Sequence, residues 1–246
     1  MPVKRLSWQM ATVAELRDEN AGARTLVLDL PDWAGHLAGQ HVDVRLTAPD
    51  GYSTERSYSI ASAPAEGKVE ITVQRVDDGE VSPYLASVLS VGDPLELRGP
   101  VGGWFVWRPA QNPPVQLIAG GSGVVPLMAM ARTRAAAGST APFRLLYSVR
   151  GPESVFYRDE LTKLAGPGSG LKLTYAYTRQ KPPDWPHPAG RIDAALLAAR
   201  VWPVSEGPRV YVCGPTPFVE TVADLLVDAG HDAAGIRTER FGPTGG

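Results

Sequence analysis

Between Trp8 and Arg98 the chain is a series of short runs in which apolar and polar residues alternate. Alternation with a period of two predicts strands, and the Gly, Pro and Asp residues between the runs predict turns. One short helix is predicted at 82–89, with Ser82 as its N-cap and Pro83 in the first turn, where a missing N–H does no harm. The predicted strands are 25–30, 41–46, 56–60, 69–75 and 94–98. Short strands at this spacing favour an antiparallel β-barrel or sandwich.

The pattern changes after residues 107–114, a predicted linker rich in proline and polar residues. Beyond it, strands alternate with helices, which favours a parallel sheet with helices on both faces. The predicted strands are 115–120, 143–149, 171–178, 209–214 and 236–241, and the predicted helices are 125–137, 155–164, 193–200 and 216–230. We therefore expect two domains, an antiparallel β-barrel at 1–108 and a Rossmann-like α/β domain at 109–246.

Composition excludes several classes of function. The formal net charge is -2, and no run of Lys or Arg forms the basic stripe that a nucleic acid needs. The N-terminus lacks the apolar core of a signal peptide, and no apolar run is long enough to span a membrane. We expect a soluble, cytoplasmic monomer that binds neither nucleic acid nor a membrane.

Cysteine and histidine usage limits the available chemistry. A single cysteine, Cys213, excludes an internal disulfide and an iron–sulfur cluster held by four cysteines of this chain. The four histidines are scattered without metal-binding spacing, so a zinc site is not expected. Any redox cofactor must therefore be organic.

The stretch ERSYSIASAP, at 55–64, has an unusual distribution of side chains for a strand. On a pleated strand, Arg56 and Tyr58 point to one face, whereas Ser57 and Ser59 point to the other. An ordinary half-buried strand would place Val, Ile or Leu on one face. Either the small, hydroxylated face meets water, or a flat polar ligand lies against it.

The segment AGGSGVVP, at 119–126, is a predicted strand-to-helix turn. Glycines at such a turn let the backbone approach a phosphate, towards which the helix N-terminus directs free N–H groups. The segment lacks the third glycine of the dinucleotide fingerprint, and a plain tight turn is the alternative. It also nearly matches the G-x-S-x-G elbow of serine hydrolases through Ser122, but Val124 replaces the last glycine.

The segment YVCGPTPF, at 211–218, ends another predicted strand. Cys213 is expected at the carboxyl edge of the parallel sheet, where ligands of open α/β folds bind. A small thiol there suits contact with a flat ring. The alternative is a buried small apolar residue, which is a common role of free cysteine.

Five motifs occur in order across nearly the whole chain: RSYS (56–59), GEVSPYL (79–85), GGSGVVP (120–126), CGPTPF (213–218) and ERFG (239–242). Together they resemble the ferredoxin–NADP reductase superfamily, and more narrowly the stand-alone bacterial flavin reductases that supply electrons to ferredoxins and oxygenases. The resemblance implies that the barrel binds FAD and that the α/β domain binds NADP or NAD.

The resemblance also assigns roles to residues of the barrel. It implies that Arg56 neutralises the FAD pyrophosphate, that Tyr58 packs on the isoalloxazine and that Ser59 hydrogen-bonds near the reactive flavin nitrogen. The same resemblance places five further residues at the flavin site, two in the next strand and three in the pyrophosphate loop: Val73, Arg75, Gly79, Val81 and Ser82. A surface role for Arg56 and a simple capping role for Ser82 are the alternatives.

In the second domain, the resemblance implies two groups of residues. The turn that binds the dinucleotide phosphates and the wall beside the nicotinamide comprise Gly121, Ser122, Gly123, Pro126, Cys213, Gly214 and Pro215. Glu239 and Phe241 match positions near the flavin face, but GPTGG follows Phe241, so a terminal aromatic cannot simply cap the ring. Ser59, Cys213 and Glu239 are the predicted catalytic residues.

The preference for one dinucleotide depends on charge near the adenosine ribose, because a 2′-phosphate needs positive charge. The ends of the second and third strands of this domain carry Ser148, Arg150, Arg158, Thr178, Arg179 and Arg191. This composition favours NADPH and leaves NADH possible. Solvated surface arginines are the alternative interpretation.

The predicted function is an FAD-dependent NAD(P)H oxidoreductase that passes electrons to a separate acceptor such as a ferredoxin or an oxygenase component. One alternative is a non-catalytic, flavin-binding regulatory subunit. Another is a serine hydrolase that uses Ser122, a downstream acid and His231.

Overall fold

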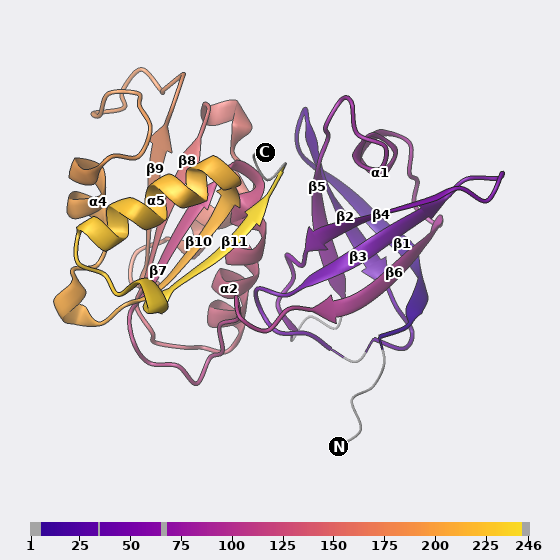
Figure 1. Ribbon diagram of the computed structural model, residues 1–246, viewed down its shortest axis with the longest axis horizontal. Coiled ribbons are helices and arrows are strands. Elements are labelled where there is room, and N and C mark those ends of the chain that lie inside the picture. The colour runs from indigo at the N-terminus through magenta and orange to yellow at the C-terminus, as the bar shows by residue number, and fades with distance from the viewer. Residues whose placement is uncertain (1–5, 34, 65–67, 243–246) are drawn as a thin grey trace.

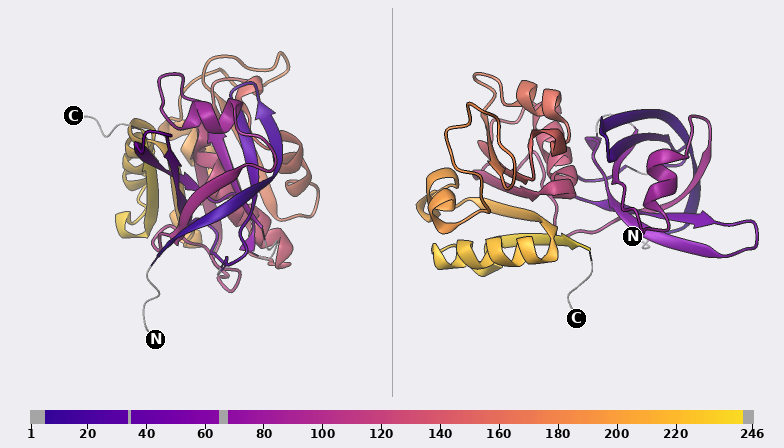
Figure 2. Two further views of the ribbon diagram at one scale, coloured as in Figure 1. Left: turned by 90° about the vertical axis from the view of Figure 1, so that its right-hand side faces the viewer. Right: turned by 90° about the horizontal axis from the view of Figure 1, so that it is seen from above.

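The computed structural model describes residues 6–33, 35–64 and 68–242. Two domains lie side by side, an antiparallel barrel formed by the first part of the chain and a parallel-sheet domain formed by the second (Figure 1). The view from above in Figure 2 (right) shows the same arrangement. The predicted fold class is confirmed. No helix among the described residues is long and apolar enough to cross a membrane.

The barrel is a six-stranded sheet in the order β4-β3-β6-β1-β2-β5. Backbone pairing of Ile60 with Ile71 and the bond from Ala61 N to the Glu70 carbonyl (2.7 Å) join the outer strands. Apolar side chains from every strand fill the interior, which α1 adjoins through Leu85. The elements are β1 (Trp8–Asn20), β2 (Ala23–Asp29), β3 (His41–Thr47), β4 (Ser53–Ser59), β5 (Val69–Gln74), α1 (Ser82–Ser87) and β6 (Pro94–Val101).

Strand β1 is absent from the sequence-based prediction. It is the longest strand of the barrel, but Ala11 and Val13 are its only buried residues. Irregularities in its pairing with β2, at 13–15 and 18–20, interrupt the alternation from which strands are recognised. Pairing with β2 and β6 therefore forms this strand, and its local hydrophobic pattern does not reveal it.

The second domain has a five-stranded parallel sheet in the order β11-β10-β7-β8-β9. Alternation along the strands directs Leu117 and Leu145 to the face covered by α2, whereas Ile118 and Leu146 face α4 and α5. The elements are β7 (Val115–Gly120), α2 (Val124–Ala136), β8 (Phe143–Val149), α3 (Arg158–Leu164), β9 (Leu171–Tyr177), α4 (Ala194–Arg200), β10 (Arg209–Pro215), α5 (Thr216–Asp228) and β11 (Ile236–Phe241). The chain reverses direction across the sheet between β7 and β10, which is where ligands of such folds bind.

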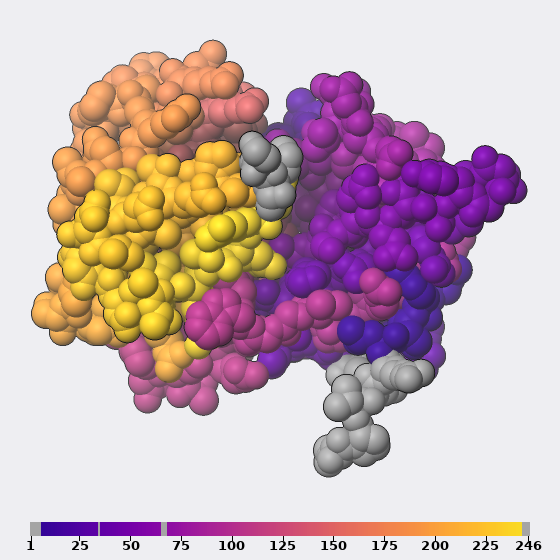
Figure 3. Space-filling view, in the orientation of Figure 1, coloured from indigo at the N-terminus to yellow at the C-terminus, as the bar shows by residue number. Residues whose placement is uncertain are grey.

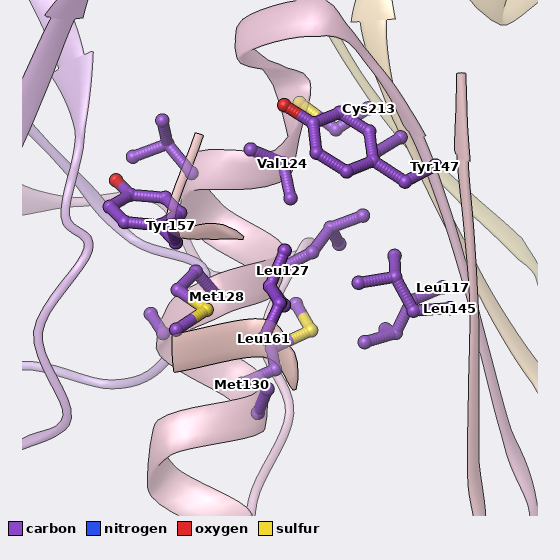
Figure 4. Close-up of a cluster of buried hydrophobic side chains, with 14 of the residues drawn as sticks. Leu117, Val124, Leu127, Met128, Met130, Leu145, Tyr147, Tyr157, Leu161 and Cys213 are labelled. Atoms are coloured by element: carbon purple, nitrogen blue, oxygen red, sulfur yellow. The ribbon is translucent and has the colours of Figure 1, made fainter. Parts of the chain in front are cut away.

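Helix α2 lies between the parallel sheet and the barrel, and every residue from Val124 to Arg134 is buried. Figure 4 shows Leu127 on this helix beside Leu117 and Leu145 of the sheet, whereas Tyr157 lies on the opposite side. The apolar cluster around α2 extends into the barrel through three alanines, Ala23, Ala38 and Ala61. The first eight residues of α2 are all apolar, and burial between two domains explains why this part of the helix has no polar face.

Two predicted helix starts are wrong. Ser82 is the first helical residue rather than the N-cap; its hydroxyl accepts a hydrogen bond from Val76 N (3.0 Å) and so cannot cap α1 in the usual way. Helix α3 begins at Arg158 rather than at 155, because Tyr157 adopts a left-handed conformation with φ 55°. Both differences arise from contacts with residues outside the helices.

Candidate functional site

A cleft opens at the carboxyl edge of the parallel sheet, at the β7–β10 switch point, and both domains line it. Its volume is about 530 Å³. The barrel contributes the β1–β2 turn and Gln74, and the second domain contributes the turn after β7 and the ends of β8 and β10. The position and size of the cleft are those expected of a nucleotide site in an open α/β domain.

The turn after β7 uses its glycines in two ways. Gly121 has φ +54°, and a Cβ there would meet no atom within 4 Å, so its backbone is accessible from the cleft. Gly123 is buried, and a Cβ there would lie 2.1 Å from the Cys213 carbonyl oxygen. Glycine is therefore required at 123 for close packing of the turn against β10, and at 121 for a backbone conformation that other residues rarely adopt.

A second cavity of about 450 Å³ adjoins the cleft and shares Ser148, Arg150 and Thr178 with it. Arg179 and Arg191 add two further positive charges to its lining. The lining contains no acidic side chain, so the cavity has the electrostatic character of an anion site. The structure thus brings together five of the six residues predicted near the adenosine ribose, whereas Arg158, the first residue of α3, is exposed and lines neither cavity.

The other residues predicted for the dinucleotide divide into two groups. Gly121, Ser122 and Pro215 line the cleft, as does Phe241, which is 38% exposed. The four residues that do not line it, Gly123, Pro126, Cys213 and Gly214, are buried behind it. Of the GPTGG segment after Phe241, residues 243–246 lie outside the described residues.

Strand β4 separates its side chains as predicted. Arg56 and Tyr58 lie opposite Val44 and Val42 of β3, on the face that borders the barrel interior. Burial raises the pKa of Tyr58 to about 12, so this hydroxyl stays protonated. On the other face Ser57 donates to Asp43 Oδ1 (2.7 Å). The carboxylate of Asp43 therefore satisfies the hydroxyl of Ser57. The presence of this serine on that face does not require a ligand.

Arg56 brings β4 close to the loop that precedes α1. Its Nη2 lies 3.3 Å from Glu80 Oε2, and both side chains are about half exposed. Glu80 also accepts hydrogen bonds from Tyr52 and Thr54. The arginine predicted to bind the pyrophosphate thus already faces a carboxylate at the loop where that pyrophosphate is predicted.

The remaining residues predicted at the flavin site differ in accessibility. Val73 and Val81 are buried in the barrel core, so only their backbone is available to a ligand. Arg75 is exposed and pairs with Asp77 (3.0 Å). A Cβ on Gly79 would lie 3.0 Å from the Ser82 hydroxyl, which requires a small residue where the loop meets α1.

The three predicted catalytic residues are connected through His41, which sequence reasoning missed. His41 pairs directly with Ser59 across β3 and β4, and Glu239 pairs with Cys213 across β10 and β11. His41 Nδ1 lies 3.6 Å from Glu239 Oε1 and so joins the two domains. The sequence signal was weak, because an isolated histidine on a strand has no recognisable spacing.

Glu239 is incompletely partnered. Its Oε2 is buried without a hydrogen-bond partner in the part of the chain that the structure describes. Burial raises the pKa of Glu239 to about 7. Burial also lowers the pKa of His41, although the nearby Asp43 opposes this shift. A carboxyl group that titrates near neutrality beside a predicted cofactor contact is typical of a functional position.

Cys213 is only 1% exposed. Figure 4 shows its sulfur beside Tyr147, above Val124. Burial raises the pKa of the thiol well above its usual range, and the negative charge of Glu239 adds to the effect. The side chain therefore packs as a small apolar group, whereas its contact with a nicotinamide remains a prediction.

The geometry does not support a serine hydrolase. Ser122 lies near the N-terminus of α5, at the cleft that Pro215 also lines. His231 follows the C-terminus of the same helix and is buried there. The thirteen residues of α5 separate these ends by roughly 20 Å. His231 cannot act as a base for Ser122 over such a distance.

Comparison with known families accounts for both domains. Residues 11–106 match the model of the oxidoreductase FAD-binding domain, and residues 117–224 match that of the oxidoreductase NAD-binding domain. The chain is 32% identical over 210 residues to the glycine betaine monooxygenase reductase subunit of Chromohalobacter salexigens, covering 84% of this chain and 56% of that protein. It is 30% identical over 223 residues to a flavohemoprotein of Halalkalibacterium halodurans, covering 86% and 54%. The chain thus spans about half the length of these curated relatives.

Solved structures give the same result. The FAD/NAD-binding domain of nitric oxide dioxygenase from Vibrio cholerae superimposes with a TM-score of 0.84 at 27% identity, covering 96% of this chain and 99% of that one. The ferredoxin reductase in carbazole 1,9a-dioxygenase superimposes with a TM-score of 0.82 at 26% identity, covering 98% and 71%. With both domain models matched in this order on this fold, the chain belongs to the ferredoxin–NADP reductase superfamily of FAD- and NAD-binding oxidoreductases.

Proposed function

We propose that this protein oxidises NAD(P)H with FAD and passes the electrons to a separate acceptor, such as a ferredoxin or an oxygenase component. The observation that carries the proposal is the cleft of about 530 Å³ at the sheet switch point, which is lined by both the FAD-binding and the NAD-binding domain. A reductase needs such a cleft because two flat rings must meet between the domains. We assign residues 1–108 and 109–246 to the two domains and expect a monomer.

The residues present fit both cofactors. Among the described residues the buried Oε2 of Glu239 has no hydrogen-bond partner, so it can bond a polar group placed between His41 and Cys213. Gly121 presents open backbone to the cleft at the N-terminus of α2, where a phosphate is favoured. When bound, FAD supplies the hydride-accepting and electron-transferring chemistry.

The protein's own residues would position and protect the cofactors. Tyr58 offers a neutral ring for stacking, and Arg56 can turn from Glu80 to a diphosphate. Ser59, next to His41, would steady the reactive edge of the flavin. The buried Cys213 and Gly214 would give the nicotinamide pocket a small, water-free wall behind Pro215. Holding donor and acceptor in this way can lower a barrier by roughly 7 to 11 kcal/mol.

The second cavity supports a preference for NADPH. Arg150, Arg179 and Arg191 line it, and the lining contains no carboxylate that would favour an unmodified ribose. Arg191→Ala is expected to raise the KM for NADPH at least tenfold with little change for NADH. Arg158→Ala is the matched control, because Arg158 is exposed outside both linings. An equal rise in the KM for NADPH and for NADH would contradict the preference for NADPH.

The central test is anaerobic reduction of the reconstituted flavoprotein. NADPH should bleach the flavin absorbance, and Ser59→Ala should retain FAD while slowing the bleaching at least tenfold. Failure to bind FAD after reconstitution would refute the proposal. Stoichiometric FAD that neither NADPH nor NADH reduces would favour a non-catalytic flavin-binding subunit. If NADPH bleaches the flavin of the Ser59→Ala variant as fast as that of the wild type, the role assigned to this serine is wrong.

A further inference from the structure

Alternate residues of β11 form a row that leads from the cleft to the surface. Phe241 lines the cleft, Glu239 meets His41, and Arg237 donates to the carbonyl oxygens of Trp104 (3.0 Å) and Val106 (2.9 Å). At about 3.3 Å per residue, Arg237 lies roughly 13 Å along the strand from Phe241. The row therefore connects the proposed cofactor site with the segment between β6 and β7 by a short path.

Trp104 is the exposed end of this path. Its side chain is 60% exposed, whereas the next three residues, 105–107, are buried between the domains. The guanidinium of Arg237 lies 5.2 Å from the centre of its ring. Figure 3 shows magenta atoms of this connecting segment at the surface between the two domains. Exposed tryptophans with neighbouring arginines are typical anchors of protein–protein contacts.

Positive charge gathers around Tyr211, whose ring also lies next to Arg237. The Tyr211 hydroxyl and Arg237 Nη1 both donate to the Val106 carbonyl oxygen (3.0 and 2.9 Å). Arg209 lies two residues before Tyr211 on the same face of β10, and Arg108 lies two residues after Val106. The charges of all three arginines oppose the rise in the pKa of Tyr211 that burial causes. None of these arginines forms an ion pair within the described residues, whereas Arg45 and Arg98 of the barrel do. In a chain with a net charge of -2, this is a local basic surface with uncompensated charge.

We propose that Trp104, Arg108, Arg209 and Arg237 form the docking surface for a protein electron acceptor whose own docking face is acidic. This inference rests on the proposed function, because a docking surface is the place where the reduced protein would pass electrons to its acceptor. Arginines without acidic partners steer an acidic partner, and the indole anchors it. A second copy of this chain is a poor occupant, because a symmetric contact would place these arginines against one another.

The test uses NADPH oxidation by the full FAD-loaded protein with a plant-type ferredoxin and a flavodoxin as acidic acceptors. Arg108→Glu combined with Arg209→Glu should raise the KM for both carriers at least tenfold, while reduction of ferricyanide stays within twofold of wild type. Rising salt concentration should raise the KM of the wild type for both carriers, and it should raise the KM of the double variant less. Trp104→Ala should raise the same KM several-fold and keep the salt dependence.

Arg240→Glu is the matched control. Arg240 lies on the same strand, pairs with Glu220 at 3.6 Å and points to the face opposite Arg237. It should change the KM for the acidic carriers less than twofold. If the double variant fails to fold, Arg108→Glu combined with Trp104→Ala replaces it, since both side chains are exposed.

Direct binding separates this inference from the proposed function. Calorimetry with the oxidised carriers needs no turnover, so loss of binding in the double variant supports the docking surface even if ferricyanide is not reduced. Absent ferricyanide reduction would instead refute the proposed function. Equal binding by wild type and double variant, or binding of neither carrier by the wild type, would overturn the docking surface.

Discussion

Two of the polar contacts between the domains have opposite character. In one, Arg132 is 8% exposed and bonds Glu160 through Nε and Nη2, and the Ala61 carbonyl and Glu70 through Nη1, all within 2.7–2.9 Å. Beside it the Tyr157 hydroxyl bonds Thr72. In the other contact, His41 and Glu239 approach only to 3.6 Å, and Glu239 Oε2 remains without a partner in the described part of the chain.

The difference in hydrogen bonding between the Arg132 contact and the His41–Glu239 contact indicates the role of each. A buried network in which the charged groups are paired fixes one arrangement of the domains, because any displacement leaves charges uncompensated. A buried carboxylate with a free oxygen is unfavourable in the protein alone and is expected where a ligand will complete its bonding. The Arg132 contact therefore holds the domains in place, and the Glu239 contact belongs to the site.

The largest effect is expected from Arg132→Met. The substitution leaves Glu70 and Glu160 without this shared partner, so the free energy of unfolding should fall by about 3–5 kcal/mol. Denaturant unfolding of the full chain measures it. Arg240→Met removes an exposed pair and should cost less than about 0.5 kcal/mol. Equal effects of the two substitutions would show that the Arg132 network does not hold the domains.

Glu239→Gln should stabilise the protein at high pH. The pKa of Glu239 is raised from 4.5 to about 7, so its stability contribution is complete below about pH 4.5 and is lost as pH rises through about 7. Gln mimics the protonated form, and because the side chain is a quarter exposed we expect a gain of about 1–2 kcal/mol at pH 8. Near pH 4, where both the folded and the unfolded forms of Glu239 are largely protonated, the gain should almost vanish. A gain independent of pH would contradict the assigned titration.

Tyr157→Phe is a smaller change in the domain contact that contains Arg132. It removes the hydroxyl that bonds Thr72 but keeps the ring, and Thr72 retains its bond to Thr25 (2.6 Å). The expected loss is about 1 kcal/mol in the free energy of unfolding. Tyr84→Phe is a suitable control, because that side chain is partly exposed on α1. A neutral Tyr157→Phe would show that the Tyr157–Thr72 bond adds little.

His41→Asn should have the smallest effect. Burial keeps the pKa of His41 below 6.5, so the ring is largely neutral when Glu239 ionises near pH 7. The midpoint of the Glu239 carboxyl, followed by carbon NMR and assigned with Glu239→Gln, should move by less than about one unit. A larger movement would mean that His41 and Glu239 titrate as a coupled pair.

Local pattern predicted much of this fold, because alternating strands, β–α succession and turn residues are encoded over short distances. The parallel-sheet strands lie within one or two residues of their predicted positions, since burial on both faces gives them uninterrupted apolar runs. Strand β1 was missed because its residues are mostly polar and pair irregularly with β2. Ser82 and Tyr157 were misassigned because Val76 and the residues of the other domain determine their conformations.

The sequence by itself determined the two-domain architecture, the family motifs and the residue types of the site. Only the tertiary structure decided which of these residues meet. It placed Ser57 against Asp43, buried Cys213, gathered Arg150, Arg179 and Arg191 around one cavity, and brought His41 to Glu239 from the other domain. The physical reason is that periodicity reports which face of an element is buried, whereas contacts between elements depend on how whole domains pack.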